Sequence, residues 1–197
     1  MRIQIFSDIH NDLKALERLT KTPADLYISA GDLVSWERGL PDCGAVLRPL
    51  GDKLWVLPGN HETAEQIASF CTQFGFRNFH EQVFKAAGHH FAGLGYSNPT
   101  PFDTPGEYSE EELEEKLDSF KNLSPLVLVV HAPPRGTTLD EIAGGNHIGS
   151  HAVRKFVDAH HPQYLFCGHV HEDAGKSDQL GETKAFNVGK QGYVLEI

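Results

Sequence analysis

Five short apolar segments of the chain are each followed by Asp, Asn or His, and this pattern constrains the fold more than any other feature. The segments are expected to be strands at residues 2–6, 26–29, 53–57, 126–130 and 164–167. The polar residues that follow them lie in Asp8-Ile9-His10, Gly31-Asp32, Gly59-Asn60-His61-Glu62, His131 and Gly168-His169-Val170-His171. Because the carboxyl ends of the strands in an open α/β sheet lie on one edge, these side chains are expected to converge there.

Amphipathic helices alternate with the apolar segments, which indicates an α/β protein. Two capping boxes, Thr63-Ala-Glu-Gln66 and Ser109-Glu-Glu-Glu112, predict helix starts. A third helix is expected to begin at Ser150. Paired short runs separated by Gly, between residues 82 and 94 and between residues 183 and 196, predict two hairpins. We therefore expect a sheet-rich core with helices outside it.

The length and charge of the chain bound its function. A chain of 197 residues has room for one domain, which we place at residues 1–197. Its formal net charge of -10 argues against a protein that neutralises the phosphates of long nucleic acids or of a membrane surface. The charge is uneven, because the stretch 103–118 contains eight acidic residues against one Lys.

The chain shows no sign of a membrane or an oxidising environment. No apolar run approaches the roughly 20 residues that a membrane span needs. Neither end resembles a targeting signal, so we expect a cytoplasmic protein. The three cysteines, Cys43, Cys71 and Cys167, are far apart and form no CxxC pair. They are therefore expected to be small buried residues rather than disulfide partners or zinc ligands.

The expected cluster of Asp, Asn and His is typical of a metal site. Carboxylate, carboxamide and imidazole groups bind hard or borderline divalent cations. In Gly59-Asn60-His61-Glu62 and Gly168-His169-Val170-His171, a Gly before the polar residues permits a positive φ and a close approach of the backbone to a bound ion. Each segment alone is common in proteins. Five of them in this order, each closing a strand, make a metal site the favoured interpretation.

This order of motifs resembles that of the calcineurin-like metallophosphoesterases, from Asp8 to His171. The likeness is greatest to the small bacterial and archaeal phosphoesterases. The segments that carry it are His131-Ala-Pro-Pro134, Gly145-Asn-His-Ile-Gly-Ser150 and Cys167-Gly-His-Val-His-Glu172. The resemblance implies the family's four-layer α/β/β/α sandwich in a single domain.

Carried over by position, the resemblance implies two divalent metal ions. One would be held by Asp8, His10, Asp32 and His171, and the second by Asp32, Asn60, His131 and His169. Asp32 is expected to bridge the ions because a carboxylate has two oxygens. A mixed set of nitrogen and oxygen ligands without Cys favours Mn²⁺, Fe²⁺ or Zn²⁺. His61 matches the family's catalytic histidine, which is not a metal ligand.

The implied activity is metal-dependent hydrolysis of a small phosphoester, with a phosphodiester favoured over a phosphomonoester. In this chemistry a hydroxide that bridges two ions about 3.5–4 Å apart attacks phosphorus in line with the leaving oxygen. His61 would protonate the leaving alkoxide or bind the charge of the transition state. The alternative is a non-catalytic metal-binding or protein-interaction module on the same fold. Because His61 and the whole ligand set are present, we favour the enzyme.

Four further residues are candidate substrate contacts. Protein Ser/Thr phosphatases of this superfamily have an Asp that orients the catalytic histidine and an Arg that holds phosphate. Here Ser35 stands at the position of that Asp, so protein phosphatase activity is not expected, and what orients His61 is left open. Arg38 follows it as a candidate contact. Residues 131–149 have little periodicity, and long irregular loops are often functional, so Arg135 and His147 are candidates as well. The segment 98–105 could border the cleft, with Phe102 as an apolar contact.

Overall fold

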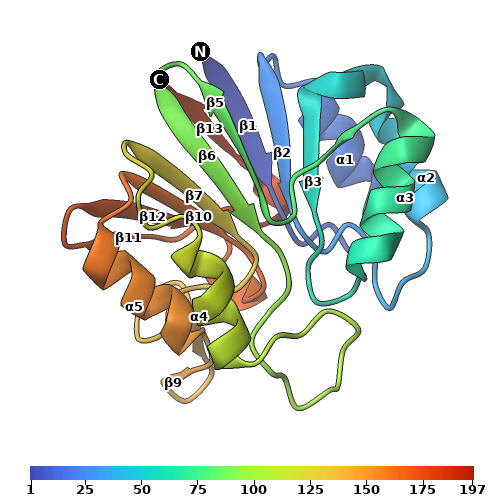
Figure 1. Ribbon diagram of the computed structural model, residues 1–197. Helices are drawn as coiled ribbons and strands as arrows, with labels where there is room; N and C mark the ends of the chain where they lie inside the picture. Colours follow the sequence, from blue (N-terminus) through green and yellow to red (C-terminus); the bar gives the residue numbers. More distant parts are fainter.

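The computed structural model describes residues 1–197 and consists of two β-sheets packed face to face, with helices on both outer faces (Figure 1). The first sheet has the order β13 (Tyr193–Glu196), β1 (Arg2–Phe6), β2 (Leu26–Ala30), β3 (Leu54–Leu57) and β4 (Arg77–Asn78). The second has the order β11 (Ser177–Leu180), β12 (Thr183–Asn187), β10 (Tyr164–Cys167), β7 (Leu126–Val130), β6 (His89–Leu94) and β5 (Gln82–Ala86).

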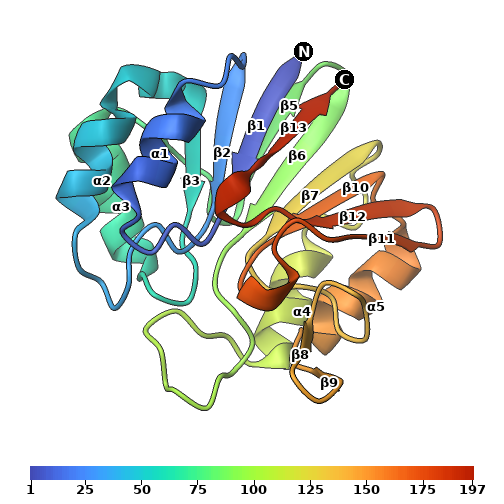
Figure 2. The ribbon, with the colours of Figure 1, turned by 180° about the vertical axis from the view of Figure 1, so that it is seen from behind.

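Helices cover the outer face of each sheet, as seen from both sides of the molecule (Figure 2). The first sheet is covered by α1 (Leu13–Thr20), α2 (Leu40–Leu47) and α3 (Ala64–Phe74), and the second by α4 (Glu110–Asp118) and α5 (His151–His160). Short elements complete the chain: η1 (Arg48–Lys53), β8 (Glu141–Ile142), β9 (Asn146–His147), η2 (His171–Asp173) and η3 (Gly189–Gln191). The expected α/β/β/α sandwich is thus confirmed.

Strand β7 shows why the central strands are apolar on both faces. Successive side chains of a strand point to opposite faces of the sheet. Val127 and Val129 therefore lie in the core between the two sheets, with Ile5 of β1 and Phe166 of β10. The alternate side chains of β7 pack under α4 and α5, in a separate cluster with Leu165. A strand buried on both faces needs apolar residues at every position.

The carboxyl ends of strands from both sheets meet on the same side of the sandwich. Strands β1, β2 and β3 are parallel neighbours in the first sheet, and β7 and β10 are parallel neighbours in the second. His131, which follows β7, donates from Nδ1 to the carbonyl of Ala30 at the end of β2 (2.9 Å). The polar residues thus converge as expected, but at the joint end of two sheets rather than along one edge of a single sheet.

Local signals predicted three of the five helices. Both expected capping boxes are present at the starts of α3 and α4, and Ser150 caps α5 by accepting from the amide of Val153 (3.2 Å). Helices α1 and α2 were not predicted. The N-cap of α2, Gly39, makes no side-chain capping bond, and α2 is only eight residues long, so its start carries a weak signal.

One of the two expected hairpins is wrong. Strands β5 and β6 form the hairpin predicted at residues 82–94. At residues 183–196, however, β12 pairs with β11 in the second sheet, whereas β13 pairs with β1 in the first. Gly189 and Gly192 between them have positive φ angles of 48° and 74°, and they carry the chain from one sheet to the other. The Gly-separated pattern therefore marks a crossover here.

The structure also bears on the expectations about membranes and cysteines. None of the helices has the length and apolar character needed to cross a membrane. All three cysteines are unpaired and buried, as expected.

We predict that Phe166→Ala lowers the free energy of unfolding by about 3–5 kcal/mol, because it opens a cavity in the core between the sheets. Phe166 is fully buried and stacks on Phe186 with ring centroids 5.4 Å apart. Phe102→Ala is the control, since Phe102 is 71% exposed and its loss should change stability by less than about 0.5 kcal/mol. Urea unfolding measures both, and equal effects would contradict the assignment of this core.

Candidate metal centre

Four of the expected ligands form a first group of donor atoms at the joint end of the sheets. Nε2 of His10 lies 2.9 Å from Nε2 of His171 and 3.5 Å from Oδ2 of Asp32, and Nε2 of His171 lies 3.6 Å from Oδ1 of Asp8. Donors bound to one ion at about 2.0–2.2 Å are expected to lie roughly 3 Å or slightly more from one another. These four residues therefore fit a single divalent cation.

A second group of donors lies beside the first. Nε2 of His131 is 3.4 Å from Oδ2 of Asp32 and 3.1 Å from Oδ1 of Asn60. Nδ1 of His169 is 2.9 Å from the same Asn60 oxygen. The spacing again fits donors around one ion. The seven residues proposed as ligands from the sequence are thus brought together in two groups that share Asp32.

The two oxygens of Asp32 have different neighbours. Oδ2 faces both His10 and His131, while Oδ1 accepts the backbone N–H of His61 (3.0 Å). A single oxygen, not the pair that we expected, is therefore common to both groups. Burial opposes ionisation, but the neighbouring His131 holds the pKa of Asp32 well below its usual range. In turn, Asp32 outweighs the effect of burial on His131 and raises the pKa of that imidazole to about 9.

The backbone is strained where these side chains leave the strands. Asp8, His10, Asp32 and His169 have positive φ angles of 54°, 45°, 54° and 71°. Residues other than Gly rarely adopt this conformation, and such outliers cluster at functional sites. The conformation turns the side chains of four of the seven candidate ligands toward a common centre.

Gly59 and Gly168 allow close packing rather than unusual backbone angles. A Cβ on Gly59 would lie 2.0 Å from Oδ1 of Asp32, and one on Gly168 would lie 2.4 Å from Oδ2 of Asp8. Neither glycine has the positive φ that it would permit, and in the second motif His169 adopts one instead. The close approach is present, but it is to the carboxylates of the two aspartates.

Second partners fix the orientation of the imidazoles. Nδ1 of His131 donates to the carbonyl of Ala30, and Nδ1 of His10 lies 3.0 Å from Oγ of Ser35. Each contact leaves Nε2 directed toward the group of candidate metal-ligand atoms. Partners of this kind commonly orient metal-binding histidines.

The carboxamide of Asn60 is oriented by a residue that we did not single out from the sequence. Nδ2 of Asn60 donates to Oγ1 of Thr104 (3.2 Å), whose hydroxyl donates to Glu107. The Asn60 oxygen is thereby turned toward His131 and His169. Thr104 lies in the segment 98–105, which we expected only to border the cleft.

His61 is oriented by the backbone, which answers the question left open by Ser35. Nδ1 of His61 accepts the N–H of Trp36 (3.1 Å), and the Trp36 ring packs edge-on against the imidazole at 5.3 Å. The proton of the neutral ring is therefore on Nε2. His61 lies within 4.8 Å of donor atoms of His10 and Asp32. A protonated nitrogen cannot bind a metal, so this arrangement suits a hydrogen-bond donor better than a ligand.

Glu62 supports the site, and the sequence analysis missed its role. Its fully buried carboxylate accepts the backbone N–H groups of Asp32 (3.1 Å), Val34 (2.9 Å) and Gly59 (2.9 Å). It thus ties the segment after β2 to the segment after β3. The available signal was the last residue of the Gly-Asn-His-Glu motif, in which we considered only Asn60 and His61.

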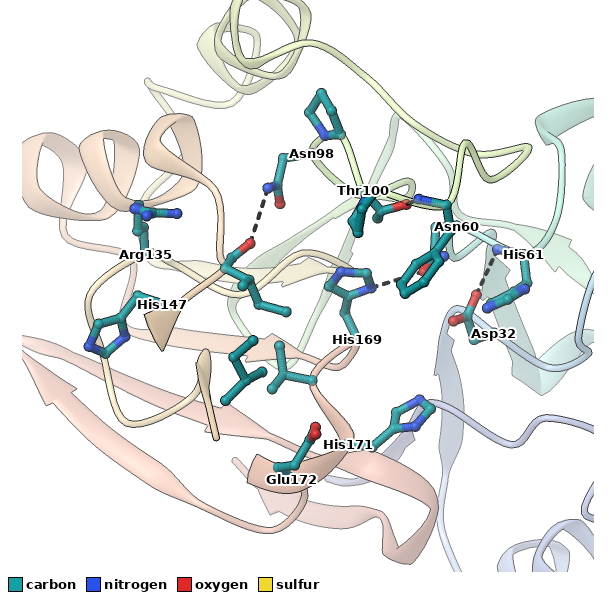
Figure 3. Close-up of a pocket in the computed structure, with 16 residues that line it drawn as sticks. Asp32, Asn60, His61, Asn98, Thr100, Arg135, His147, His169, His171 and Glu172 are labelled. Atoms are coloured by element: carbon teal, nitrogen blue, oxygen red, sulfur yellow. Dashed lines mark hydrogen bonds between the residues drawn. The ribbon is translucent and has the colours of Figure 1, made fainter. Parts of the chain in front are cut away.

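A cavity of about 550 Å³ opens from the donor groups (Figure 3). Asp32, His61 and His169 lie at one end of it, and Arg135 and His147 line the opposite end. The structure thus brings three of the four candidate substrate contacts, Arg135, His147 and Phe102, into the same cavity as the candidate ligands. Arg38 is exposed and is not among the residues that line it.

Comparison with known proteins agrees with this geometry. The model of the calcineurin-like phosphoesterase family matches residues 1–173. An uncharacterized protein of Methanocaldococcus jannaschii is 36% identical over 203 residues, covering 99% of this chain and 91% of that protein. The chain therefore belongs to the calcineurin-like phosphoesterase family.

Solved structures share the fold at lower identity. A Thermus thermophilus protein has a TM-score of 0.72 and 22% identity, covering 96% of this chain and 90% of that one. A putative 5′-nucleotidase from Staphylococcus aureus has a TM-score of 0.59 and 14% identity, covering 98% of this chain and 49% of that one. At these identities the likeness concerns the fold.

We predict that Glu62→Ala lowers the free energy of unfolding by about 3 kcal/mol or more, because it leaves three buried N–H groups without an acceptor. Glu65→Ala serves as the control, since Glu65 is exposed on the first turn of α3 and its loss should cost less than about 1 kcal/mol. Urea unfolding compares the two variants. A Glu62→Ala protein as stable as the control would exclude the supporting role.

Proposed function

We propose that the protein is a dinuclear-metal phosphoesterase that hydrolyses a small phosphoester. The observation that carries the proposal is the pair of donor groups that share Oδ2 of Asp32 beside the oriented His61. Two divalent ions held there would supply an activated water and stabilise the charge that develops on the phosphoryl oxygens. The mixed nitrogen and oxygen donors favour Mn²⁺, Fe²⁺ or Zn²⁺, and Mn²⁺ is the first to test.

His61 stabilises the transition-state charge in this proposal. The amide of Trp36 occupies Nδ1, so the imidazole offers an N–H at Nε2. This N–H can donate a hydrogen bond to a phosphoryl oxygen as negative charge develops there. Because the His61 backbone also donates to Asp32, this hydrogen-bond donor is held in a fixed relation to the carboxylate that both donor groups share.

A phosphodiester suits the cavity better than a phosphomonoester. Arg135 is the only Arg or Lys among the lining residues, and it lies at the end away from Asp32 and His61. A diester carries one negative charge at the reacting phosphate, whereas a monoester at neutral pH carries close to two. The diester therefore needs less cationic support beside the metals. The cavity volume also leaves space for an organic group of the substrate.

We further propose that the substrate is small and the protein cytoplasmic. The formal charge of -10 disfavours long polyanions as partners. Three unpaired, buried cysteines support a reducing compartment.

We predict that His61→Ala lowers kcat for bis(p-nitrophenyl) phosphate with added Mn²⁺ by about 10²–10³-fold, the usual cost of removing one hydrogen-bond donor to the charge that develops in a transition state. His151→Ala is the matched control, because His151 is exposed at the start of α5. Bound metal is measured in all three proteins. A wild type that is inert with metal bound would favour a non-catalytic binding module, and equal activity in His61→Ala would remove His61 from the mechanism.

We predict that Asp32→Asn loses metal from both positions, because its carboxylate belongs to both donor groups. Asn60→Ala should weaken mainly one position, since Asn60 contacts only His131 and His169 among the candidate ligands. Elemental analysis after equilibration with Mn²⁺ gives the metal content of each variant. Two ions still bound to Asp32→Asn would refute the shared position.

A further inference from the structure

We infer that the end of the cavity away from the metal donors is a subsite for a second anionic group of the substrate, bound by Arg135 and His147. The inference rests on the proposed function and specifies its substrate class. That class is a phosphodiester in which an apolar, flat group separates the reacting phosphate from a further phosphate or carboxylate.

Arg135 is a half-buried cation without an acidic partner. No carboxylate lies within 4.0 Å of its guanidinium, and its one side-chain hydrogen bond is a long contact to the carbonyl of Gly149 (3.5 Å). The neighbouring Arg154, by contrast, pairs with Asp158 at 2.8 Å. A guanidinium that lines a cavity with most of its donors free is suited to bind a phosphate or carboxylate in a bidentate manner.

His147 is held beside Arg135 by a buried carboxylate. Nδ1 of His147 donates to Oδ1 of Asp140 (2.8 Å), and Asp140 is fully buried. Asp140 also accepts the backbone N–H groups of Thr137 (2.8 Å) and Gly149 (2.9 Å), so it fixes the loop that carries His147. With Nδ1 occupied, Nε2 is the free nitrogen of the ring. In the protonated imidazole, Nε2 donates to an anion.

Apolar side chains line the cavity as well. The chain has five exposed large hydrophobic side chains, and two of them, Phe102 (71% exposed) and Ile148 (37% exposed), line this cavity. Exposed apolar groups that cluster in one cleft indicate a binding surface for an apolar part of a ligand. Phe102 supplies an aromatic face for a flat group such as a nucleobase.

These walls are held in place without a ligand. Glu107 accepts the backbone N–H groups of Thr100 (3.1 Å) and Thr104 (2.8 Å), which fixes the segment that carries Phe102. Nδ2 of Asn98 donates to the carbonyl of Ile148 (3.1 Å) and joins this segment to the loop of Arg135. The two walls of the cavity are therefore tied to each other by the protein itself.

The acidic side chains of the cavity do not oppose an anion beside Arg135. Besides Asp32, the only carboxylate that lines it is Glu172, which lies next to His171 in η2 (Figure 3). Asp32 is at the end where the metal donors gather, and Glu172 lies beside His171, away from Arg135. The cavity is therefore acidic where cations would bind and basic where the second anion would bind.

A matched pair of substrates tests the subsite. The p-nitrophenyl ester of thymidine 5′-phosphate lacks a second anion, and its derivative with an added 3′-phosphate carries one. With Mn²⁺, we expect the wild type to prefer the derivative in kcat/KM by about 10-fold or more, mainly through KM, as a charge-assisted hydrogen bond would give. Arg135→Ala should abolish this preference, and His147→Gln should reduce it. Arg48→Ala, an exposed Arg on η1, is the charge-matched control and should keep it.

Three outcomes would overturn the inference. The first is a wild type without preference, and the second is a preference that survives Arg135→Ala. The third is an equal loss with both esters in Arg135→Ala, which would place Arg135 on the reacting phosphate instead.

A binding measurement separates this inference from the proposed function. Calorimetric titration of the Mn²⁺-loaded protein compares thymidine 3′,5′-bisphosphate with thymidine 5′-phosphate. Tighter binding of the bisphosphate that is lost in Arg135→Ala supports the subsite even if neither ester is hydrolysed, in which case the proposed function alone fails. Equal binding of both nucleotides would overturn the subsite, whatever the activity.

Discussion

The structure depends on the burial of carboxylates at the joint end of two sheets. Asp8, Asp32 and Glu62 are all nearly or fully buried there, and isolated buried charges are strongly destabilising. Burial raises the pKa of Glu62 to about 8 even though its carboxyl accepts three backbone N–H groups. Asp8 accepts the N–H of His169 and the hydroxyl of Ser7, whereas Oδ2 of Asp32 faces only imidazole nitrogens. This unequal distribution leaves Oδ2 of Asp32 without a backbone or hydroxyl donor, so the positive charge beside it comes from the imidazole of His131 or would come from divalent cations in its place.

Much of the fold follows from local signals. The strand at residues 126–130 was predicted with correct ends because burial on both faces requires an uninterrupted apolar run. The capped helices were predicted because a capping box satisfies the first N–H groups of a helix within four residues. The strand β13 could not be assigned in this way, since its pairing with β1 joins the two ends of the chain and no local signal distinguishes it from a hairpin.

The residue types of the candidate site could be predicted from the sequence, but the orientation of their side chains could not. Asn60, His61 and His131 follow strands, so their convergence follows from topology. The partners that decide which atom faces the centre are distant in sequence, such as Thr104 for Asn60 and the Trp36 amide for His61. A backbone amide donor cannot be recognised from the residue type. Ser35, at the position of the Asp of the protein Ser/Thr phosphatases, indicated only that one possible partner of His61 is absent. Ser35 contacts His10 instead.

Two carboxylates of the acidic stretch at residues 103–118 have specific structural roles. Glu107 holds the cavity wall through Thr100 and Thr104, and Glu110 caps α5 by accepting the hydroxyl of Ser150 and the amide of Ala152. These carboxylates are engaged by hydrogen bonds near the cavity, and Arg135 at its far end has no acidic partner. The net charge of -10 therefore does not describe the field that a small ligand meets inside the cavity. Under the proposed function, a long polyanion would meet the acidic exterior, whereas a small diester could enter between the two metal ions and the guanidinium of Arg135.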